Sequence, residues 1–496
     1  MSKTFYITTT LPYVNADLHV GHALEFVRAD TIARYKKLAG FDVFFNSGTD
    51  EHGMKIYNKA KETGKDPKKF ADEAFERFKE QTRSFGMSED VHYVRTTDER
   101  HEKSAQKFWE KVADNGFIYK KNYKTKYCVG CEEEKTESEL VNGKCSIHPN
   151  RELEIVDEEN YFFSFSKFQK PLLNFYEKNP GFVIPKFRYN EVIAFVKRGL
   201  EDFSISRLKS KMPWGIPVPG DDEHIMYVWF DALTNYISTL GWGISEGEPL
   251  NCPSPKGFPL GNGELFQKFW INGTPTQYCG KDNTRFQAIM WQAMLMAAGI
   301  PNTYQIVVNG HITAEGGIKM SKSLGNVVDP KEISAEYGVD ALRYFLLGEV
   351  SSFEDSPFSR ERFKEIYNAK LANGLGNLVS RIMKMAQDNL EKTAEIPEWE
   401  DKKEFFDYFE KFEINKACDF IWSEISEMDK FIQENQPFRV VKTDKEKGVK
   451  MISDLVVRLY SVARMLNPIL PETSEKIKEL IKQNKTPDKP LFARKD

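Results

Sequence analysis

Residues 4–45 read TFYITTTLPYVNADLHVGHALEFVRADTIARYKKLAGFDVFF, and this stretch sets the fold class. Thr4–Thr10 is rich in residues that favour strands, and the proline that follows ends the run. Apolar residues then recur at helical spacing from near His19 to Gly40, and Phe41–Phe45 is a short apolar run typical of buried parallel strands. A strand, turn, helix and strand in this order predict a doubly wound, mostly parallel α/β sheet.

Length and composition limit the class of protein. A chain of 496 residues is expected to hold three or four domains, at roughly 100–200 residues each. Contents of 40% hydrophobic and 13% aromatic residues exclude wholesale disorder, and six cysteines are too few for a disulfide scaffold. No run approaches about 18 apolar residues, and the N-terminus lacks a signal-peptide pattern, so we expect a soluble, cytoplasmic protein without a membrane partner.

The character of the sequence changes several times along the chain. Residues 117–220 carry a cysteine cluster and many charges without a βαβ rhythm, which indicates an insertion that splits the α/β domain. The α/β pattern resumes at Ile225–Phe230 and continues through Gln277–Gly280 and Ile306–Val308. The last part is helical in pattern and favours an α-helical bundle. The expected divisions are a first α/β half at 1–116, an insertion at 117–220, a second α/β half at 221–318, a connecting segment at 319–366 and a helical domain at 367–496.

His19-Val20-Gly21-His22 lies at the predicted turn between the first strand and the first helix. A helix N-terminus offers unpaired N–H groups and the positive end of the helix dipole, which favour phosphate. Gly21 lets a ligand approach the backbone, and two imidazoles three residues apart on one helical face can both donate to phosphate oxygens. Two half-buried helix histidines are an equal alternative for this motif taken alone.

Lys319-Met320-Ser321-Lys322-Ser323 is flanked by Gly316-Gly317 and Gly325-Asn326. Two lysines in a glycine-bracketed loop can bring positive charge over a polyphosphate. Reaction at phosphorus needs positioning and charge neutralisation more than a protein nucleophile. A solvated basic loop is the usual alternative, but the HVGH motif most of an α/β domain earlier disfavours it.

Cys128, Cys131, Cys145 and His148 form two short ligand pairs separated by 13 residues. Such pairs supply four ligands for a closed, tetrahedral and structural Zn²⁺ site. Disulfide pairing is the competing interpretation, and a cytoplasmic chain with a Cys-x-x-His half disfavours it. We expect the neighbouring acidic run Glu132–Glu134 to form a solvated face, and the sequence offers no evident partner for His101.

HVGH and KMSKS together resemble the signature motifs of class I aminoacyl-tRNA synthetases, and further details are similar to the methionyl-tRNA synthetase family. These details follow the family order over almost the whole chain: Leu11–Tyr13, Gly48–Gly53, Tyr227–Ala232, Gly280–Asp282 and Asn309–His311. The resemblance implies a Rossmann-like catalytic domain split by a zinc-knuckle insertion, a segment that carries the KMSKS loop and contacts the tRNA stem, and an anticodon-binding α-bundle.

The same resemblance implies a two-step reaction. Methionine and ATP give methionyl-adenylate and pyrophosphate, and the methionyl group passes to the 3′-terminal adenosine of tRNA(Met), initiator and elongator. His19 and His22 are then expected to stabilise the transition state, and Lys322, helped by Lys319, to hold the leaving pyrophosphate with Mg²⁺. No general base is needed for the first step, because a carboxylate is ionised near pH 7. The implied ATP-binding residues are His19, Gly21, His22, Glu25, Asp282, Gly310, His311 and Lys322.

The resemblance also implies a methionine pocket. Asp50 would pair with the substrate ammonium, together with the backbone of Leu11. Aromatic side chains would surround the thioether, and contacts of this kind contribute about 0.3–1.5 kcal/mol each. Taken singly, each of these aromatics is more typical of an ordinary core; the set is Tyr13, Trp229, Tyr236, Phe286 and Trp291. The family usually has histidine where this chain has Gln287, and we expect recognition to persist because glutamine can hydrogen-bond near the sulfur or to Tyr13.

The helical C-terminal part would read the anticodon. The chain as a whole is slightly acidic, with a net charge of −4, so tRNA must meet a local basic face. Six Lys and Arg oppose two Glu between Ser359 and Ala386, and Asn377 and Arg381 are four residues apart on one predicted helical face. Phe438 stands where the family often has a stacking tryptophan. A generic helical bundle with a basic face is the alternative.

Rival functions are less compatible with the sequence. Synthetases for branched aliphatic amino acids carry a large editing insertion, for which the insertion here is too short, and a cysteine enzyme is expected to hold zinc in its amino-acid pocket. A tRNA-binding relative without catalysis is disfavoured by the intact HVGH, KMSKS, Asp50 and Trp229, and a small HxGH nucleotidyltransferase by the long helical region. Since the chain ends soon after that region, we expect a monomer.

Overall fold

The computed structural model describes residues 3–135, 140–244, 263–314, 316, 328–398 and 402–496. The chain forms two compact units, each built from separate segments of sequence. Unit 1 consists of Met1–Asp17, Phe41–Glu80 and Glu89–Val308, and unit 2 of Leu18–Gly40, Gln81–Ser88 and Asn309–Asp496.

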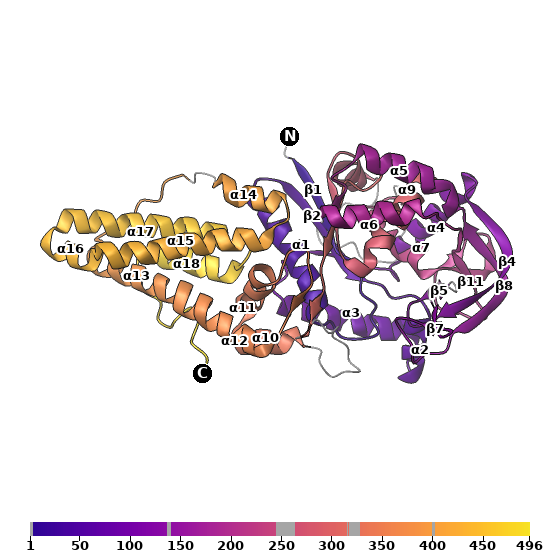
Figure 1. Ribbon diagram of the computed structural model, residues 1–496, viewed down its shortest axis with the longest axis horizontal. Helices are drawn as coiled ribbons and strands as arrows, with labels where there is room; N and C mark the ends of the chain where they lie inside the picture. Colours follow the sequence, from indigo (N-terminus) through magenta and orange to yellow (C-terminus); the bar gives the residue numbers. More distant parts are fainter. Residues whose placement is uncertain (1–2, 136–139, 245–262, 315, 317–327, 399–401) are drawn as a thin grey trace. The chain divides into compact units, whose positions relative to one another are not determined.

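A six-stranded sheet forms the centre of unit 1, with the strand order β3-β2-β1-β14-β15-β9. The pairs β1/β2, β1/β14, β2/β3 and β15/β9 are parallel. This confirms the predicted mostly parallel sheet, including its first two strands (Figure 1). The strands are β1 (Thr4–Thr8), β2 (Asp42–Thr49), β3 (His92–Arg95), β9 (Val183–Ile184), β14 (Pro275–Gly280) and β15 (Gln305–Asn309).

Apolar side chains on this sheet and its covering helices form one large core. Tyr6 lies opposite Phe44 in the β1/β2 register, and both join a buried cluster that includes Phe108 and Trp291. The strands are therefore fixed by burial against helices of the same unit. The helices of unit 1 are α2 (Met54–Glu62), the greater part of α3 (Pro67–Ser84), α4 (Glu99–Asp114), α5 (Gln169–Lys178), α6 (Lys186–Lys197), α7 (Val228–Ala232), α8 (Asn235–Ser238) and α9 (Trp291–Ala298).

The insertion forms antiparallel sheets of its own. A long pair, β4 (Ile118–Cys128) with β8 (Glu154–Phe163), is flanked by β5 (Glu133–Lys135) and β10 (Phe203–Ser204). The remaining short strands of the insertion are β6 (Leu140–Val141), β7 (Lys144–Cys145), β11 (Ser206–Leu208) and β12 (Pro217–Val218), and β13 (Asp221–Met226) follows it.

The expected return of the parallel sheet at Ile225–Phe230 is wrong. β13 pairs antiparallel with β11 and β12, and α7 begins at Val228. A short apolar run cannot be assigned to strand or helix by periodicity alone. Here the Met226 N–H donates to the Ile216 carbonyl at 2.7 Å, which ties the end of the strand to its antiparallel neighbour.

Unit 2 is mainly helical and confirms the predicted C-terminal α-bundle. Its first helix, α1 (Val20–Leu38), comes from the N-terminal part of the chain, and α13, α15 and α17 pack side by side (Figure 1). A short parallel pair, β16 (Ile312–Thr313) and β17 (Ser356–Pro357), follows the sheet strand β15. The other helices are α10 (Pro330–Tyr337), α11 (Val339–Tyr344), α12 (Arg360–Ile366), α13 (Asn377–Asn389), α14 (Lys403–Glu410), α15 (Ile414–Asn435), α16 (Pro437–Thr443), α17 (Lys445–Leu466) and α18 (Pro471–Gln483).

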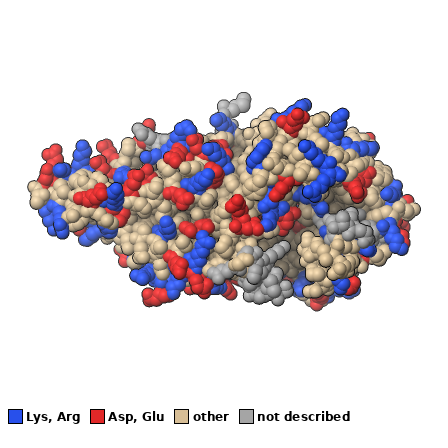
Figure 2. All heavy atoms as spheres, in the orientation of Figure 1, with Lys and Arg blue, Asp and Glu red and all other residues tan. Residues whose placement is uncertain are grey.

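Charged side chains of both signs are intermixed on the face shown in Figure 2. Within the described part of the chain, no helix is long and apolar enough to cross a membrane.

Candidate active site and metal centre

The HVGH motif forms the N-terminus of α1. His19 is the N-cap, and its Nδ1 accepts the Gly21 N–H at 3.0 Å, while His22 Nδ1 accepts the His19 N–H at 3.2 Å. This reciprocal arrangement is a capping box, here built from two imidazoles. Their rings stack, with centroids 3.9 Å apart. The predicted helix start is confirmed, but His19 precedes the helix, so the two imidazoles meet by stacking.

The capping contacts set the chemistry of both rings. Because each Nδ1 accepts a backbone N–H, a neutral ring carries its proton on Nε2. In that form His19 and His22 each carry an Nε2–H at the positive end of α1. A Cβ on Gly21 would lie 2.9 Å from the His19 ring, so the glycine is required for the ring to fold back over the backbone.

Three further residues of the predicted ATP site belong to unit 2, with the two histidines. Glu25 is buried on α1. Gly310 is buried, and a Cβ at this position would lie 2.2 Å from the backbone of Glu354. The next residue, His311, is half-buried.

Asp282 is exposed on a 3₁₀ turn of unit 1, Lys281–Asn283. Lys319 and Lys322, with the rest of the KMSKS string, lie outside the described residues. The structure therefore tests neither lysine.

Asp50 and Tyr13 lie side by side in unit 1. A parallel bridge joins their backbones, in which the Asp50 N–H donates to the Pro12 carbonyl at 3.0 Å. Both side chains present buried atoms without a hydrogen-bond partner among the described residues, Oδ1 of Asp50 and the hydroxyl of Tyr13. Burial, then the charges of Asp231 and Glu132, raise the pKa of Asp50 well above its usual range. A cation would reverse this effect, so the carboxylate is suited to bind one.

The predicted aromatic residues also gather in unit 1. Trp229 on α7 stacks on Phe286 with ring centroids 3.8 Å apart and planes 7° from parallel. The ring centroids of Tyr236 on α8 and Trp291 on α9 lie 6.0 Å apart, and Trp291 is fully buried. The indole N–H groups of Trp229 and Trp291 are buried without partners in the described part of the chain. Leu11 is half-buried two residues before Tyr13.

Gln287 is 1% exposed and its side chain contacts two others. Its Nε2 donates to the hydroxyl of Tyr236, and its Oε1 accepts from Gln277 Nε2 at 2.8 Å. The glutamine is thus held by Tyr236, whereas Tyr13 was one of the partners that the sequence suggested.

A buried cluster that the sequence did not reveal lies behind the loop at residues 50–53, here called the Asp50 loop. His52 Nδ1 and His101 Nε2 each lie 2.7 Å from an oxygen of Asp231, and His101 Nδ1 lies 2.9 Å from the Ser238 hydroxyl. Burial opposes charge on His52, but Asp231 outweighs it and the pKa of His52 is raised. The cluster ties the Asp50 loop to α7 and α8, and it gives His101 the partner that the sequence did not show.

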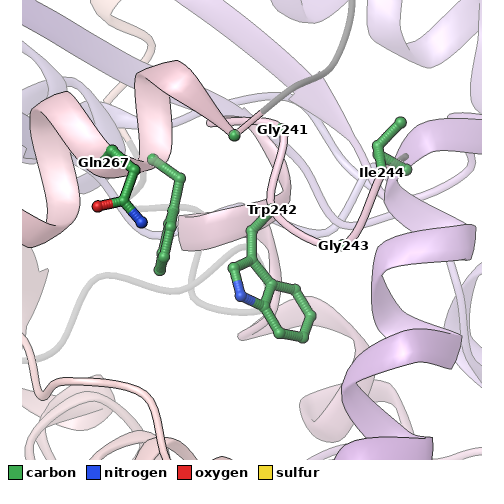
Figure 3. A pocket seen from close by; sticks show the side chains of 7 residues that line it. Gly241, Trp242, Gly243, Ile244 and Gln267 are labelled. Carbon is green, nitrogen blue, oxygen red and sulfur yellow. The ribbon is translucent and has the colours of Figure 1, made fainter. Parts of the chain in front are cut away.

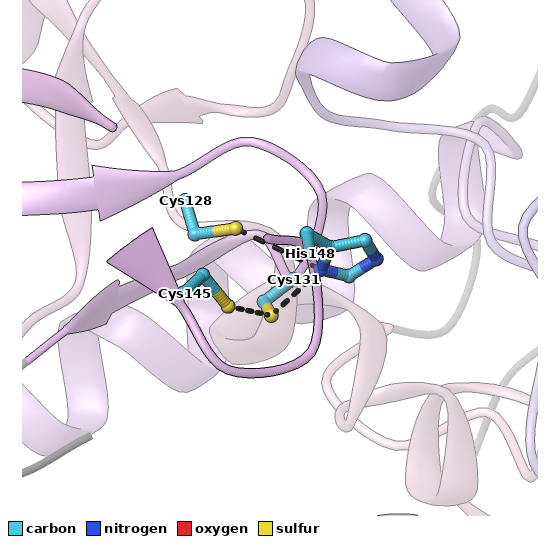
Figure 4. Close-up of side chains that lie close together, drawn as sticks. All are labelled: Cys128, Cys131, Cys145 and His148. Atoms are coloured by element: carbon cyan, nitrogen blue, oxygen red, sulfur yellow. Dashed lines mark hydrogen bonds between the residues drawn. The ribbon is translucent and has the colours of Figure 1, made fainter. Parts of the chain in front are cut away.

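The four predicted metal ligands converge in the insertion (Figure 4). Cys128, Cys131, Cys145 and His148 place one ligand atom each within 4.8 Å of the others. Cys131 Sγ lies 3.5 Å from Cys145 Sγ and 3.3 Å from His148 Nδ1, and Cys128 Sγ lies 3.8 Å from the same nitrogen. These separations match the edges of a tetrahedron around Zn²⁺, about 3.5–3.8 Å for metal–ligand bonds of about 2.0–2.3 Å. The cluster can therefore hold a metal ion.

Local features adapt this cluster to a metal. A Cβ on Gly130 would lie 2.7 Å from the His148 ring, so only glycine allows the imidazole to close over the Cys128–Cys131 turn. Burial opposes ionisation of Cys145, but the backbone N–H groups of His148 and Ile147 outweigh it and lower the pKa of this thiol. Thiolates are the form that binds metal.

The expected solvated face at Glu132 is wrong. Glu132 is fully buried and its backbone has a positive φ of 57°. Its carboxylate accepts from the Tyr127 hydroxyl at 2.5 Å and from the Lys55 N–H at 2.8 Å, at the start of α2. Its carbonyl accepts from the Tyr227 hydroxyl at 2.6 Å. The residue next to the predicted metal ligand Cys131 therefore caps the helix that follows Asp50, and sequence spacing carries no signal for such a contact.

The predicted anticodon residues are exposed on helices of unit 2. Asn377 begins α13, and Arg381 on the next turn forms an ion pair with Asp429 of α15 at 2.5 Å. Phe438 on α16 is 42% exposed, with the Arg439 guanidinium 5.9 Å from its ring. Ion pairs neutralise part of the basic stretch, since Arg360 pairs with Glu332 and Lys384 with Asp388.

A surface pocket of about 310 Å³ occurs elsewhere in unit 1 (Figure 3). Its described lining contains none of the predicted site residues. The lining residues are Gly241, Trp242, Gly243, Ile244, Gly263, Phe266 and Gln267.

A family model described as tRNA synthetases class I (M) matches residues 5–146 and 130–383. The chain therefore belongs to the class I (M) family of tRNA synthetases.

Three similar proteins are named as methionine–tRNA ligases or methionyl-tRNA synthetases. A protein of Caldanaerobacter subterraneus subsp. tengcongensis named methionine–tRNA ligase is 40% identical over 97% of this chain and 74% of its own length. A second with this name, from Rickettsia bellii, is 39% identical over 96% of this chain and 92% of its own. Among solved structures, the methionyl-tRNA synthetase of Mycobacterium tuberculosis in complex with methionyl-adenylate has a TM-score of 0.86 and 34% identity, covering 96% of this chain and 94% of that one.

Proposed function

We propose that this chain is an ATP-dependent methionine–tRNA ligase. It activates L-methionine with ATP to methionyl-adenylate and pyrophosphate, and transfers methionine to the 3′-terminal adenosine of tRNA(Met), initiator and elongator. The observation that carries the proposal is the buried oxygen of Asp50, which has no hydrogen-bond partner among the described residues and lies in the same unit as the Trp229–Phe286 stack. Relatives that share the name methionine–tRNA ligase support it.

Asp50 binds the substrate ammonium, with help from the backbone of Leu11. A buried carboxylate gains most from a cationic partner when its pKa is raised and one of its oxygens has no partner within the described part of the chain. Tyr13, Trp229, Tyr236, Phe286, Gln287 and Trp291 surround the thioether, and sulfur–aromatic contacts favour an unbranched, polarizable side chain.

The methionine carboxylate attacks the α-phosphorus of ATP in line, and pyrophosphate leaves. The Nε2–H groups of His19 and His22 hydrogen-bond to phosphate oxygens as charge develops on them, and Gly21 admits the phosphates close to the backbone. Glu25, Asp282, Gly310 and His311 bind the rest of the nucleotide. Lys319 and Lys322 hold the leaving pyrophosphate, with Mg²⁺ brought by ATP. A ribose hydroxyl of the 3′-terminal adenosine then attacks the carbonyl carbon of the adenylate, and AMP leaves.

The cysteine cluster holds one structural Zn²⁺ per chain. Zinc suits three thiolates and an imidazole at tetrahedral separations, and it cross-links the two ends of the metal-binding loop. We expect Cys131→Ser to lower zinc from about one ion per chain to well below one, and to lower the melting temperature. Elemental analysis of dialysed protein measures the zinc content and thermal melting the stability, with Cys279→Ala, which removes a buried thiol outside the cluster, as the control. Equal zinc in both variants would refute the assignment.

Asn377, Arg381 and Phe438 contact the anticodon loop of tRNA(Met). We expect Arg381→Ala to weaken tRNA(Met) binding by about tenfold, since one such contact contributes about 1–3 kcal/mol. Filter binding measures the affinity, and Lys384→Ala on the same exposed helix is the matched control. Affinity should fall steeply with salt concentration. Salt-insensitive binding, or equal losses in the two variants, would count against the contact.

Pyrophosphate exchange tests the proposed function most directly. The purified chain is assayed with each of the twenty amino acids, and methionine alone is expected to support rapid exchange. Lys322→Ala is expected to abolish most of it. Exchange driven by another amino acid would favour a different class I synthetase, and binding of tRNA without any exchange would favour the non-catalytic relative.

A further inference from the structure

Two buried carboxylates of unit 1 obtain their partners in different ways. Asp50 and Asp231 are 2% and 1% exposed, and a buried charge is stable only when another group compensates it. Asp50 Oδ1 has no hydrogen-bond partner among the described residues. The two oxygens of Asp231, in contrast, each lie 2.7 Å from an imidazole nitrogen, one of His52 and one of His101. The protein therefore compensates Asp231 itself and leaves Asp50 to the substrate ammonium of the proposed function.

The surroundings of the two imidazoles determine which of them is charged. His52 has Asp231 at Nδ1 and Glu102 Oε1 at 3.9 Å from Nε2, so a carboxylate faces each nitrogen. Only an imidazolium carries a proton on both nitrogens, and two carboxylates stabilise this form. His101 has Asp231 at Nε2 and the Ser238 hydroxyl at 2.9 Å from Nδ1. A neutral ring that donates from Nε2 and accepts at Nδ1 satisfies both contacts of His101.

The two carboxyl groups respond to these surroundings in opposite directions. Burial raises the pKa of Asp50, and the negative charge of Asp231 raises it further. Burial also opposes the ionised form of Asp231, but the charge of His52 and the hydrogen bonds from both imidazoles outweigh it and lower the pKa of this carboxyl. Neighbouring acids whose pKa values are shifted apart take different roles. Asp231 is kept ionised by the protein, and any charge on it that His52 does not cancel makes Asp50 harder to ionise.

We infer that His52 is a positioning residue for methionine binding, because its imidazolium cancels the charge of Asp231 and so keeps Asp50 ionised for the substrate ammonium. The inference rests on the proposed function. It gives His52 and Asp231, which the sequence did not assign to the pocket, a role in substrate binding that needs no contact with the substrate.

Other charged groups also face Asp50 and His52. After burial and Asp231, Glu132 raises the pKa of Asp50 further, whereas the His52 N–H and Lys55 lower it. The pKa of His52 is raised mainly by Asp231, against burial, and Glu102 and Glu51 add to this effect. All of these groups except His52 and Asp231 stay in place in the variants below, so their charges are common to every comparison.

Methionine binding to the full chain tests this role by equilibrium dialysis without ATP, from about pH 5 to about pH 9. Binding should weaken as the pH falls through the pKa of Asp50, because the protonated carboxyl no longer attracts the ammonium. His52→Asn keeps a nitrogen donor near the Nδ1 position but removes the charge. Because Asp231 is then uncompensated, the pKa of Asp50 rises further and the acid-side loss should begin at higher pH. Affinity on this acid side should be about tenfold below wild type, with no loss at the alkaline end.

A second substitution separates charge from structure. The double variant His52→Asn/Asp231→Asn removes both charges and should return the acid-side loss to its wild-type position. His101→Gln is the matched control, since its amide nitrogen reaches the Nε2 position and the ring that it replaces is neutral, and it should leave the profile unchanged. A purely structural role predicts instead that the double variant binds methionine more weakly than His52→Asn at every pH.

NMR of a chain labelled with ¹⁵N at histidine measures the ring charge directly. The His52 signal is identified by its absence from the double variant. Both of its ring nitrogens should be protonated at about pH 6 in the wild type, and only one in Asp231→Asn, where burial is no longer opposed by this carboxylate. This measurement decides the question even where His52→Asn alone does not fold.

The inference is overturned if the His52 ring is neutral at about pH 6 in the wild type. It is also overturned if the acid-side loss does not move in His52→Asn, moves equally in His101→Gln, or is not restored in the double variant. Failure of the proposed function gives different results, because the wild-type chain would not bind methionine, or Asp50→Asn would bind it with an unchanged pH profile.

Discussion

Asp50→Asn is expected to lower kcat/KM for methionine in pyrophosphate exchange by about 10²–10³-fold. The carboxylate is buried, and one oxygen lacks a partner among the described residues. Removing one member of a buried ion pair costs about 2–5 kcal/mol, most of which here would be lost from the bound ammonium. The loss should appear mainly in KM, since Asp50 binds the ground state and the transition state alike.

The acid side of the pH profile provides a second readout for Asp50. Burial and the neighbouring carboxylates raise its pKa, so the residue takes up a proton as the pH falls through this raised value. The protonated form no longer attracts the ammonium, and KM for methionine should rise at acid pH. This rise should be absent in Asp50→Asn. Asp17→Asn, an exposed carboxylate before α1, is the control, and an equal loss in both variants would refute the assigned role.

His22→Asn is expected to lower kcat for methionyl-adenylate formation by about 10²–10³-fold, the usual cost of removing one donor from a developing charge. His22 accepts the His19 N–H through Nδ1, so its Nε2 is the donor toward phosphate. Asparagine places an oxygen near the Nδ1 position and retains the capping contact, but it does not reach the phosphate.

His22→Gln is the matched variant, because its amide nitrogen reaches the Nε2 position and loses the cap instead. We expect it to retain more activity than His22→Asn and to melt at a lower temperature, since a lost cap costs about 1 kcal/mol. Rapid-quench measurement of the first turnover and thermal melting separate the two effects. The reverse order of activities would mean that His22 serves the helix and not the phosphate.

Local patterns predicted the parts of the fold that depend on neighbours in sequence. The strand at Thr4–Thr8, the helix that His19 caps and the strand that follows it are encoded in periodicity and in a capping residue. The metal cluster could be predicted because the spacing of Cys128 and Cys131 leaves little freedom to the ligands.

Contacts between distant segments could not be predicted in this way. Asp231 meets His101 across 130 residues of sequence, and Glu132 meets Lys55 across 77. In the sequence, Asp231 and Glu132 look like ordinary charged surface residues. Only the folded chain shows that both are buried away from water. The failure at Ile225–Phe230 has a related cause, because the strand partners of this apolar run determine its sheet and its own sequence does not.

The position of Glu132 limits how the insertion can be exchanged between proteins. A designer who grafts a metal-free loop onto this scaffold also deletes the acid that caps α2, and removes the carboxylate that accepts from the Tyr127 hydroxyl. A working chimaera must therefore keep Glu132 and Tyr127 as one unit, and replacing the ligand loop alone should disturb the start of α2 even where the new loop folds.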